Sequence, residues 1–281
     1  MIRILTDSTC DLPDGVLAAH RVVVVPVNVV FGRESYQEGV TLNALSFYQK
    51  IEASKQFPTT SQPSLGQFQE VYRSLQGDPD TEAILSIHIT GRLSGTHESA
   101  VVAAGQMPME PPITVFDSLS GSMGLGFMVL EAAEMAEKGM SLPVILARLE
   151  ALRERMHVFF SLNDLKYARM SGRVSAAQAL MASLLSIKPM LTVDGGNLAV
   201  IGRVRSRSQA LQTLTDTLCE KLGDPPARIA VIHAQAPEAA EPVRAALAQR
   251  VHATQIIVHE LSIGIAVHLG PGTVGVVGYS P

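Results

Sequence analysis

Short runs of β-branched and apolar residues alternate along the chain with segments of helical period, and this alternation limits the possible folds more than any other feature. A capping box at Ser64 and Gln67, and Pro143 just after Ser141, mark the starts of two of the helical segments. Strands that alternate with helices are typical of βαβ units and a mainly parallel sheet. We therefore predict an α/β fold. The expected strands are 2–6, 22–30, 83–89, 113–116, 158–161, 228–233 and 254–260.

The second half of the chain adds antiparallel structure. Residues 191–193 and 198–201 form two short apolar runs, joined by the turn sequence of Asp194 to Asn197, which predicts a β-hairpin. A chain of 281 residues is long enough for two domains of ordinary size. We expect an N-terminal α/β domain over 1–156 with mainly parallel sheet and a C-terminal α/β domain over 157–281 with a mixed sheet, because a long helical stretch ends near residue 156.

Composition excludes several function classes. The formal charge of −4 gives no field that would attract nucleic acid. Cys10 and Cys219 form no C-x-x-C pair, and the histidines show no metal-ligand spacing, so we expect no metal and a reducing cytoplasm. No run approaches the ~18 consecutive apolar residues of a membrane span, so we expect a cytoplasmic protein that is not an integral membrane protein.

Polar residues follow the first expected strand, at the position where open α/β sheets bind ligands. Asp7 has two interpretations. It could be the nucleophile of a phosphate-ester hydrolase, although Thr9 then stands where a second carboxylate would be expected. It could instead accept hydrogen bonds from loop amides and cap the next helix, which we favour.

Three further loops carry hydroxyl groups. Pro58 and Pro63 stiffen a loop containing Thr60 and Ser61, which either presents donors to a carboxylate or simply leads into the next helix. The second loop, 90–96, precedes a helix expected to run to Gln106 and resembles a small anion cradle, but it lacks the P-loop and dinucleotide signatures. The third loop is 117–124. Loops that follow neighbouring parallel strands converge on one edge of the sheet.

Basic residues and one histidine suggest a second site. Arg203, Arg205 and Arg207 alternate, so on a strand they would share one face and could meet a phosphate or an acidic partner. A solvated sheet edge is the alternative, and the residues alone favour it. His268 lies in a Gly-Pro-Gly loop before an expected strand at 273–279, where it is either structural or placed for proton or phosphate chemistry.

Taken together, these motifs resemble the DegV family, the fatty-acid-binding subunits of bacterial fatty acid kinase systems. The resemblance extends over nearly the whole chain. The residues that carry it are Thr6-Asp7-Ser8-Thr9, Thr60-Ser61-Gln62-Pro63, Leu93-Ser94-Gly95-Thr96, Asp117-Ser118, Gly172-Arg173-Val174-Ser175, Ile187-Lys188-Pro189, the segment around Arg205, and His268 with Gly270 and Gly272.

The resemblance implies a carrier and not an enzyme. One long-chain fatty acid such as palmitate or oleate would lie in a tunnel between two domains, with no cofactor. Thr60 and Ser94 would bind the carboxylate, with Ser61, Gly95, Thr96 and Ser122 in the nearby loops. Arg205 and His268 would assist when a separate ATP-dependent kinase converts the bound acid to an acyl phosphate.

Two positions depart from the family pattern, namely Arg92 before Leu93 and Leu269 after His268. Either could alter access to the head group or the kinase docking surface. Two alternative functions stay open: the hydrolase that uses Asp7, and a binding module for another small carboxylate, whose pocket would be short and polar.

Overall fold

A computed structural model describes residues 1–54, 56–173 and 187–281, which fall into two compact units. Unit 1 is Met1–Glu154 with Ser262–Gly264, and unit 2 is Arg155–Leu261 with Ile265–Pro281. The chain therefore changes units two residues before the predicted boundary at 156 and returns to unit 1 for three residues near its end. The domains 1–156 and 157–281, as separately folding pieces, stay a prediction.

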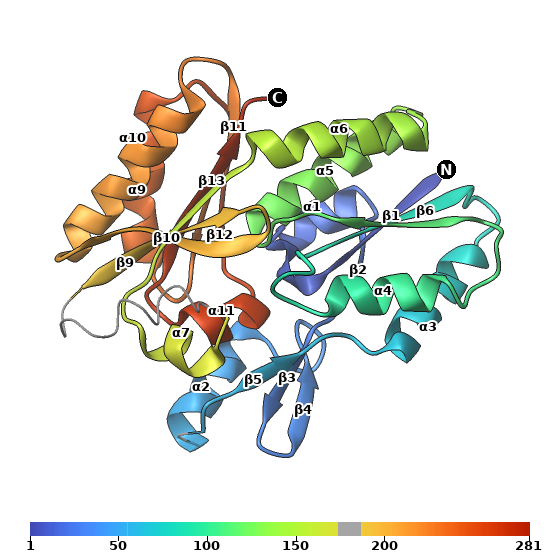
Figure 1. Ribbon diagram of the computed structural model, residues 1–281, viewed down its shortest axis with the longest axis horizontal. Helices are drawn as coiled ribbons and strands as arrows, with labels where there is room; N and C mark the ends of the chain where they lie inside the picture. Colours follow the sequence, from blue (N-terminus) through green and yellow to red (C-terminus); the bar gives the residue numbers. More distant parts are fainter. Residues whose placement is uncertain (55, 174–186) are drawn as a thin grey trace. The chain divides into compact units, whose positions relative to one another are not determined.

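Unit 1 is built on a parallel sheet with the strand order β2-β1-β6-β7 (Figure 1). Helices α3 and α4 pack on one face through Phe68, Tyr72, Ala100 and Ala103, and α5 packs on β1 and β6 from the other face. The carboxyl ends of all four strands thus meet at one edge. The bounds are β1 Ile2–Asp7, β2 Val23–Val25, β6 Ala83–His88, β7 Ile113–Asp117, α3 Leu65–Gln76, α4 Thr96–Ala104 and α5 Met123–Glu137.

A second, antiparallel sheet in unit 1 was not predicted. Its strands are β4 (Glu34–Gln37), β3 (Asn28–Phe31) and β5 (Thr59–Ser61), in that order. The single strand expected over 22–30 is in fact β2 and β3, which belong to different sheets; Pro26, which has no N–H to donate, lies between them. The other elements of unit 1 are η1 Ser8–Cys10, α1 Asp14–Ala19, α2 Ala44–Ser54 and α6 Leu142–Arg155.

Unit 2 contains a six-stranded sheet in the order β10-β9-β8-β13-β11-β12. Only β11 and β12 pair in parallel, and the predicted hairpin is β9 and β10. The predicted α/β class, with a parallel sheet in the N-terminal part and a mixed sheet in the C-terminal part, is confirmed. The strands are β8 His157–Ser161, β9 Lys188–Asp194, β10 Asn197–Val204, β11 Ala227–His233, β12 Ala253–Glu260 and β13 Val274–Tyr279.

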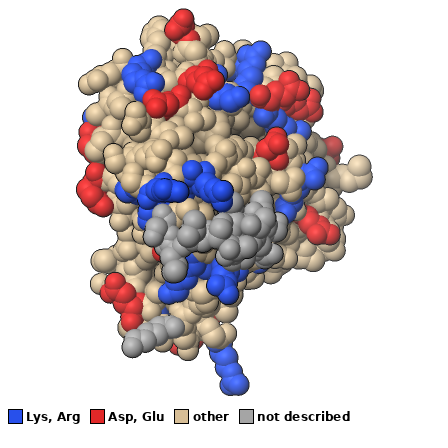
Figure 2. Space-filling model, turned by 60° about the vertical axis from the view of Figure 1, so that its left-hand side comes forward, with Lys and Arg blue, Asp and Glu red and all other residues tan. Residues whose placement is uncertain are grey.

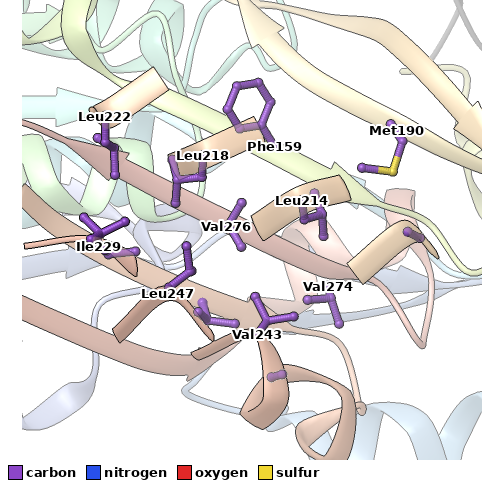
Figure 3. Packing of buried hydrophobic residues seen from close by; sticks show 14 of the residues in the cluster. Phe159, Met190, Leu214, Leu218, Leu222, Ile229, Val243, Leu247, Val274 and Val276 are labelled. Atoms are coloured by element: carbon purple, nitrogen blue, oxygen red, sulfur yellow. The ribbon is translucent and has the colours of Figure 1, made fainter. Parts of the chain in front are cut away.

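Helices α9 (Arg207–Leu222) and α10 (Pro237–Arg250) cover one face of this sheet. Figure 3 shows leucines of α9 and α10 beside Ile229, Val274 and Val276 of the strands, in the main hydrophobic cluster of unit 2. The remaining helices described here are α7 (Lys166–Ser171) and α11 (Ile263–Leu269). In the described parts of the chain, no helix combines the length and the hydrophobicity needed to cross a bilayer.

Candidate functional site

The loops that follow β1, β6 and β7 are tied together at the carboxyl edge of the unit 1 sheet. Asp7, the last residue of β1, accepts a hydrogen bond from the backbone N–H of Ile89 at 3.0 Å. The N–H of Gly91 donates to the Asp117 carboxylate at 3.2 Å, and the N–H of Thr90 donates to the carbonyl of Ser120. The predicted convergence of these loops is therefore observed.

Asp7 is an acceptor buried at the centre of this edge. Its Oδ1 accepts from the N–H and hydroxyl of Thr9, and its Oδ2 accepts from Ile89 N–H and His88 Nδ1. Burial alone would raise the pKa of Asp7, but the hydrogen bond and charge of His88, with the Thr9 and Ile89 donors, hold that pKa below its ordinary value. With no exposed surface and both oxygens occupied, Asp7 has the structural role favoured by the sequence.

A chain of buried polar groups continues from Asp7. The second ring nitrogen of His88, Nε2, lies 2.6 Å from the Ser86 hydroxyl, which lies 3.0 Å from the hydroxyl of Tyr72. The order Ser86, His88, Asp7 resembles a hydrolytic triad, but all three side chains are fully buried. A substrate has no access to Ser86 here. This row of hydrogen bonds therefore stabilises the edge of the sheet and does not catalyse a reaction.

Ser94 lies in the loop between β6 and α4, at the same edge. Its Oγ accepts from the N–H of Thr96 at 3.3 Å and lies 2.8 Å from the Thr96 hydroxyl. Ser94 is partly exposed, whereas Thr96 is fully buried. A serine hydroxyl accepts at its lone pairs and donates one proton, so Ser94 can donate that proton either to Thr96 or to an anion outside.

Thr60 approaches this loop from the antiparallel sheet. It pairs with Val29 in the centre of β5. A Cβ placed on Gly95 would lie 2.9 Å from Nε2 of Gln62, so the segment after β5 packs directly against the loop of Ser94. Ser61 is exposed on the same strand. The structure thus brings the segments of Thr60 and Ser94 together, through Gln62 and Gly95.

Ser122, the fourth nearby residue of the predicted site, is occupied within the protein. It precedes α5 with a φ of 55° and donates its hydroxyl proton to Oδ2 of Asp11. The other oxygen of Asp11 accepts from the N–H of Ser262 at 2.9 Å. Ser122 therefore fastens the third loop to the residues after β1 and is 1% exposed.

Sequence reasoning missed Glu38, a buried carboxylate close to these loops. It accepts hydrogen bonds from Ser8 Oγ at 2.6 Å and from Gly264 N–H at 3.2 Å. Burial raises the pKa of Glu38 to about 7, and the nearby charge of Asp11 adds to that rise. A carboxylate beside a glycine normally indicates a solvated turn, so only the long-range contacts could have revealed it.

Arg205 lies at one edge of the unit 2 sheet, directly after β10. The register pairs Val204 with Lys188 and Val274 with Ser161. The last residue of β10 and the first residue of β13 therefore lie at the same end of the sheet's strands. The condition for a strand face shared by Arg203, Arg205 and Arg207 is not met, because β10 ends at Val204 and Arg207 is the first residue of α9. The Ser206 cap starts the helix there.

Figure 2 shows Lys and Arg side chains gathered near the middle of one face. This view brings forward the left-hand side of Figure 1, where α7, β9 and β10 are labelled. The exposed basic residues of these elements, and of the two residues that follow each of them, are Lys166, Arg169, Arg173, Arg203 and Arg205.

His268 is in the last turn of α11, and not in the Gly-Pro-Gly loop as expected. That loop begins two residues later, where Gly270 has a φ of 84° and donates its N–H to the carbonyl of Ala266. Burial and then the positive charge of Arg173 lower the pKa of His268 to about 4. The imidazole is therefore neutral at pH 7. Of the two residues that depart from the family pattern, Leu269 is buried in the core and Arg92 is exposed.

Two motif residues, Val174 and Ser175, lie outside the described residues. Across 1–54, 56–173 and 187–281, His, Cys, Asp and Glu side chains form no group of three or more that could hold a metal ion.

A family model described as "Uncharacterised protein, DegV family" matches residues 1–280. Among curated relatives, a DegV domain-containing protein of Deinococcus radiodurans is 38% identical over 279 residues, which cover 98% of this chain and 97% of the relative. These matches extend over essentially the whole sequence.

Solved structures give the same result. A DegV family protein from Thermus thermophilus, described by its fatty acid binding, is 36% identical with a TM-score of 0.92, covering 100% of this chain and 99% of the other. Bacillus subtilis DegV, described as a fatty acid binding protein, is 31% identical with a TM-score of 0.87 over 100% and 99% of the two chains.

Proposed function

The chain is a member of the DegV family, and on this premise we propose that it binds one long-chain fatty acid, with its carboxylate held by Thr60 and Ser94. The observation that carries the proposal is the whole-length similarity to structures described as fatty acid binding. The edge of unit 1 supports it, because the Ser94 hydroxyl is partly exposed and can donate its proton to an anion when Thr96 is the donor of the bond between the two hydroxyls.

Most of the affinity comes from the acyl chain. A sixteen-carbon acid buries about 14 methylenes at about 0.8 kcal/mol each, or about 11 kcal/mol before the costs of association. The carboxylate then needs donors, because a buried charge without partners costs several kcal/mol. Hydroxyl and backbone N–H groups supply these donors. The position of the acyl chain between the two domains stays a prediction of the resemblance.

We further propose that the protein is a cytoplasmic carrier and not an enzyme by itself. A separate ATP-dependent kinase would phosphorylate the bound acid to an acyl phosphate, with Arg205 and His268 assisting. His268 suits this role as a neutral donor or acceptor, since its low pKa leaves it uncharged near pH 7. The exposed Arg205 suits it as a fixed positive charge for a phosphoryl group.

The hydrolase alternative has little support. Asp7 would need an exposed oxygen to attack phosphorus, yet both of its oxygens accept hydrogen bonds and the side chain is fully buried. The other alternative, a binding module for a small carboxylate, differs from the fatty acid carrier in the ligand: the module would retain a short carboxylate and not a long-chain fatty acid.

The first test is to denature the purified protein and analyse an organic extract by mass spectrometry. We expect one fatty acid of fourteen to eighteen carbons per chain. An empty extract, together with no binding of added palmitate or oleate by calorimetry, would contradict the proposal; a short carboxylate in the extract would favour the alternative module.

A further inference from the structure

An open groove of about 860 Å³ lies on unit 2, between α9 and α10. Its walls are apolar in the middle, where Leu211 of α9 faces Ala239 and Val243 of α10, and polar at one end, where Arg207 and Gln235 lie. None of the residues in the proposed fatty acid site lines it. The groove is therefore a separate feature and does not depend on the proposed function.

Arg207 is the unusual member of this lining. Its guanidinium is half-buried, and burial lowers its pKa. Its Nη1 is fully buried and has no hydrogen-bond partner in the part of the chain that the structure describes. A guanidinium carries five donors, and donors removed from water without a partner are costly. Arg207 also lines the groove, so its guanidinium is the charged donor nearest to an acceptor that enters at its own end.

The other charged groups of the groove define the charge of that acceptor. Arg250, at the far end, is already paired with Asp216 at 2.5 Å. Glu238 is exposed in the first turn of α10, and its charge acts on Arg207, although no ion pair within 4 Å joins the two among the described residues. One unpaired cation beside one carboxylate favours a monoanion and disfavours a dianion such as a phosphate ester. A carboxylate fits, because it can accept two parallel N–H bonds from arginine.

The apolar walls define the rest of the ligand. From Arg207 to Thr215, both of which line the groove, α9 rises about 12 Å at 1.5 Å per residue. An aliphatic body of medium length would cover Leu211 and Val243. The backbone at the polar end is also strained, since Gln235 has a φ of 49°, and such conformations are concentrated at ligand sites.

We propose that this groove is a second binding site, for a carboxylate carried on an aliphatic body, with Arg207 as the anchor of the carboxylate. Because the groove is open along its length, it buries only one side of such a body. Its affinity is therefore lower than that of an enclosed site, and exchange is fast.

The test uses the full chain with ¹³C-labelled Leu and Val methyl groups, first saturated with oleate so that any site for long-chain fatty acids is filled. Decanoate, decanol and acetate are then titrated separately and followed by NMR. We expect saturable shifts of the Leu211 and Val243 methyl signals with decanoate, and binding at least tenfold weaker with the other two. Equal binding of decanol would overturn the role of the charge, and equal binding of acetate would overturn the role of the aliphatic body.

Two variants test the anchor. Arg207→Gln should weaken decanoate binding at least tenfold, whereas Arg244→Gln, which removes a partly exposed charge paired with Glu241 on α10 outside the groove, should change it less than twofold. Should Arg207→Gln fail to fold, Ser208→Glu adds a competing carboxylate at an exposed position in the same lining and should also weaken binding at least tenfold. Unchanged decanoate binding in a folded Arg207→Gln or Ser208→Glu variant would contradict the proposal.

Discussion

The Asp7 carboxylate accepts a hydrogen bond from the imidazole of His88, with 3.0 Å between Oδ2 and Nδ1, and neither side chain is exposed to solvent. The two residues end neighbouring strands, β1 and β6. The contact therefore joins the loop after β1 to the loop that carries Ser94, and it gives Asp7 a positioning role at the proposed site.

Asp7→Asn should destabilise the protein by about 3 kcal/mol or more at pH 7. Both oxygens of Asp7 accept N–H donors, so either orientation of the new amide places its NH₂ group against a donor. Chemical denaturation measures the effect, with Asp14→Asn as the control, because Asp14 is exposed. The pKa of Asp7 in the folded state lies below its ordinary value. The stabilisation that ionised Asp7 gives the folded state is therefore complete at pH values above the ordinary pKa, and it is lost as the pH falls through the lowered pKa. The difference between wild type and variant should narrow at strongly acidic pH; equal stabilities at pH 7 would contradict the role.

Glu38 should make the protein less stable as the pH rises toward neutrality. The pKa of Glu38 in the folded state is about 7, above its ordinary value of 4.5, so between these two pH values the folded state holds a proton that the unfolded state has released. Stability therefore falls as the pH rises through this window, by about 3 kcal/mol in total. Glu38→Gln should flatten this slope in denaturation curves taken between pH 4.5 and 7.5. Glu34→Gln, on the exposed part of the same hairpin, should leave it unchanged; a slope that survives Glu38→Gln would contradict the assignment.

The double variant Ser94→Ala with Thr60→Val should retain fatty acid at least tenfold more weakly than the wild type. Each substitution removes a hydroxyl donor to the carboxylate, and a hydrogen bond to a charged group contributes about 1.5–3 kcal/mol. Competition binding with a fluorescent fatty acid gives the affinity, and Ser74→Ala, on an exposed part of α3, is the control. Unchanged retention would refute the assignment of the head-group residues.

Arg205→Ala and His268→Ala should retain fatty acid normally but lower the yield of acyl phosphate. The assay combines each variant, loaded with oleate, with a fatty acid kinase subunit and ATP labelled in its γ-phosphate. Arg244→Ala removes a partly exposed arginine elsewhere on unit 2, and this variant should react as the wild type does. Because His268 is largely buried, the thermal unfolding of the His268→Ala variant is also measured, to show that the variant is folded. Normal acyl phosphate formation in both variants would remove their proposed role.

Gly126→Ala should destabilise the protein by about 1–3 kcal/mol. A Cβ at this position of α5 would lie 2.3 Å from the carbonyl oxygen of Cys10, which is backbone and cannot move aside easily. The matched control is Gly15→Ala in α1, where a Cβ meets nothing within 4 Å. That change should leave stability equal or raise it by up to about 1 kcal/mol, because alanine favours the helix. Equal effects of the two substitutions would contradict the packing of α5.

Local sequence patterns predicted most of the fold. The strand and helix periods predicted the parallel sheet, the hairpin of β9 and β10, and the capping box at Ser64, because each depends on residues close in sequence. The sheet of β3, β4 and β5 escaped prediction because β3 and β5 are separated by more than 25 residues. The short β5 also carries two threonines and a serine, with no apolar alternation to mark it.

The loops at the carboxyl edge of the unit 1 sheet could be predicted for the same reason, whereas the roles of Thr60 and Ser94 at the site stay a prediction. The hydroxyls of Thr60 and Ser94 stand in recognisable loops, but the carboxylates that hold neighbouring segments depend on distant partners. Glu38 binds the N–H of Gly264, 226 positions away, and Asp11 binds that of Ser262, 251 positions away. No local pattern encodes such pairs. His268 was misplaced because its Gly-Pro-Gly signal marks the end of a helix as well as a loop.

The return of Ser262–Gly264 to unit 1 has an evolutionary consequence. Two buried carboxylates of unit 1 take their backbone donors from a segment that lies more than 220 positions further along the chain. A gene fusion or truncation that kept residues 1–154 without residues 262–264 would leave Asp11 and Glu38 without those donors. The two halves of this protein are therefore expected to be inherited together, and the N-terminal half should not recur alone as a transferable module.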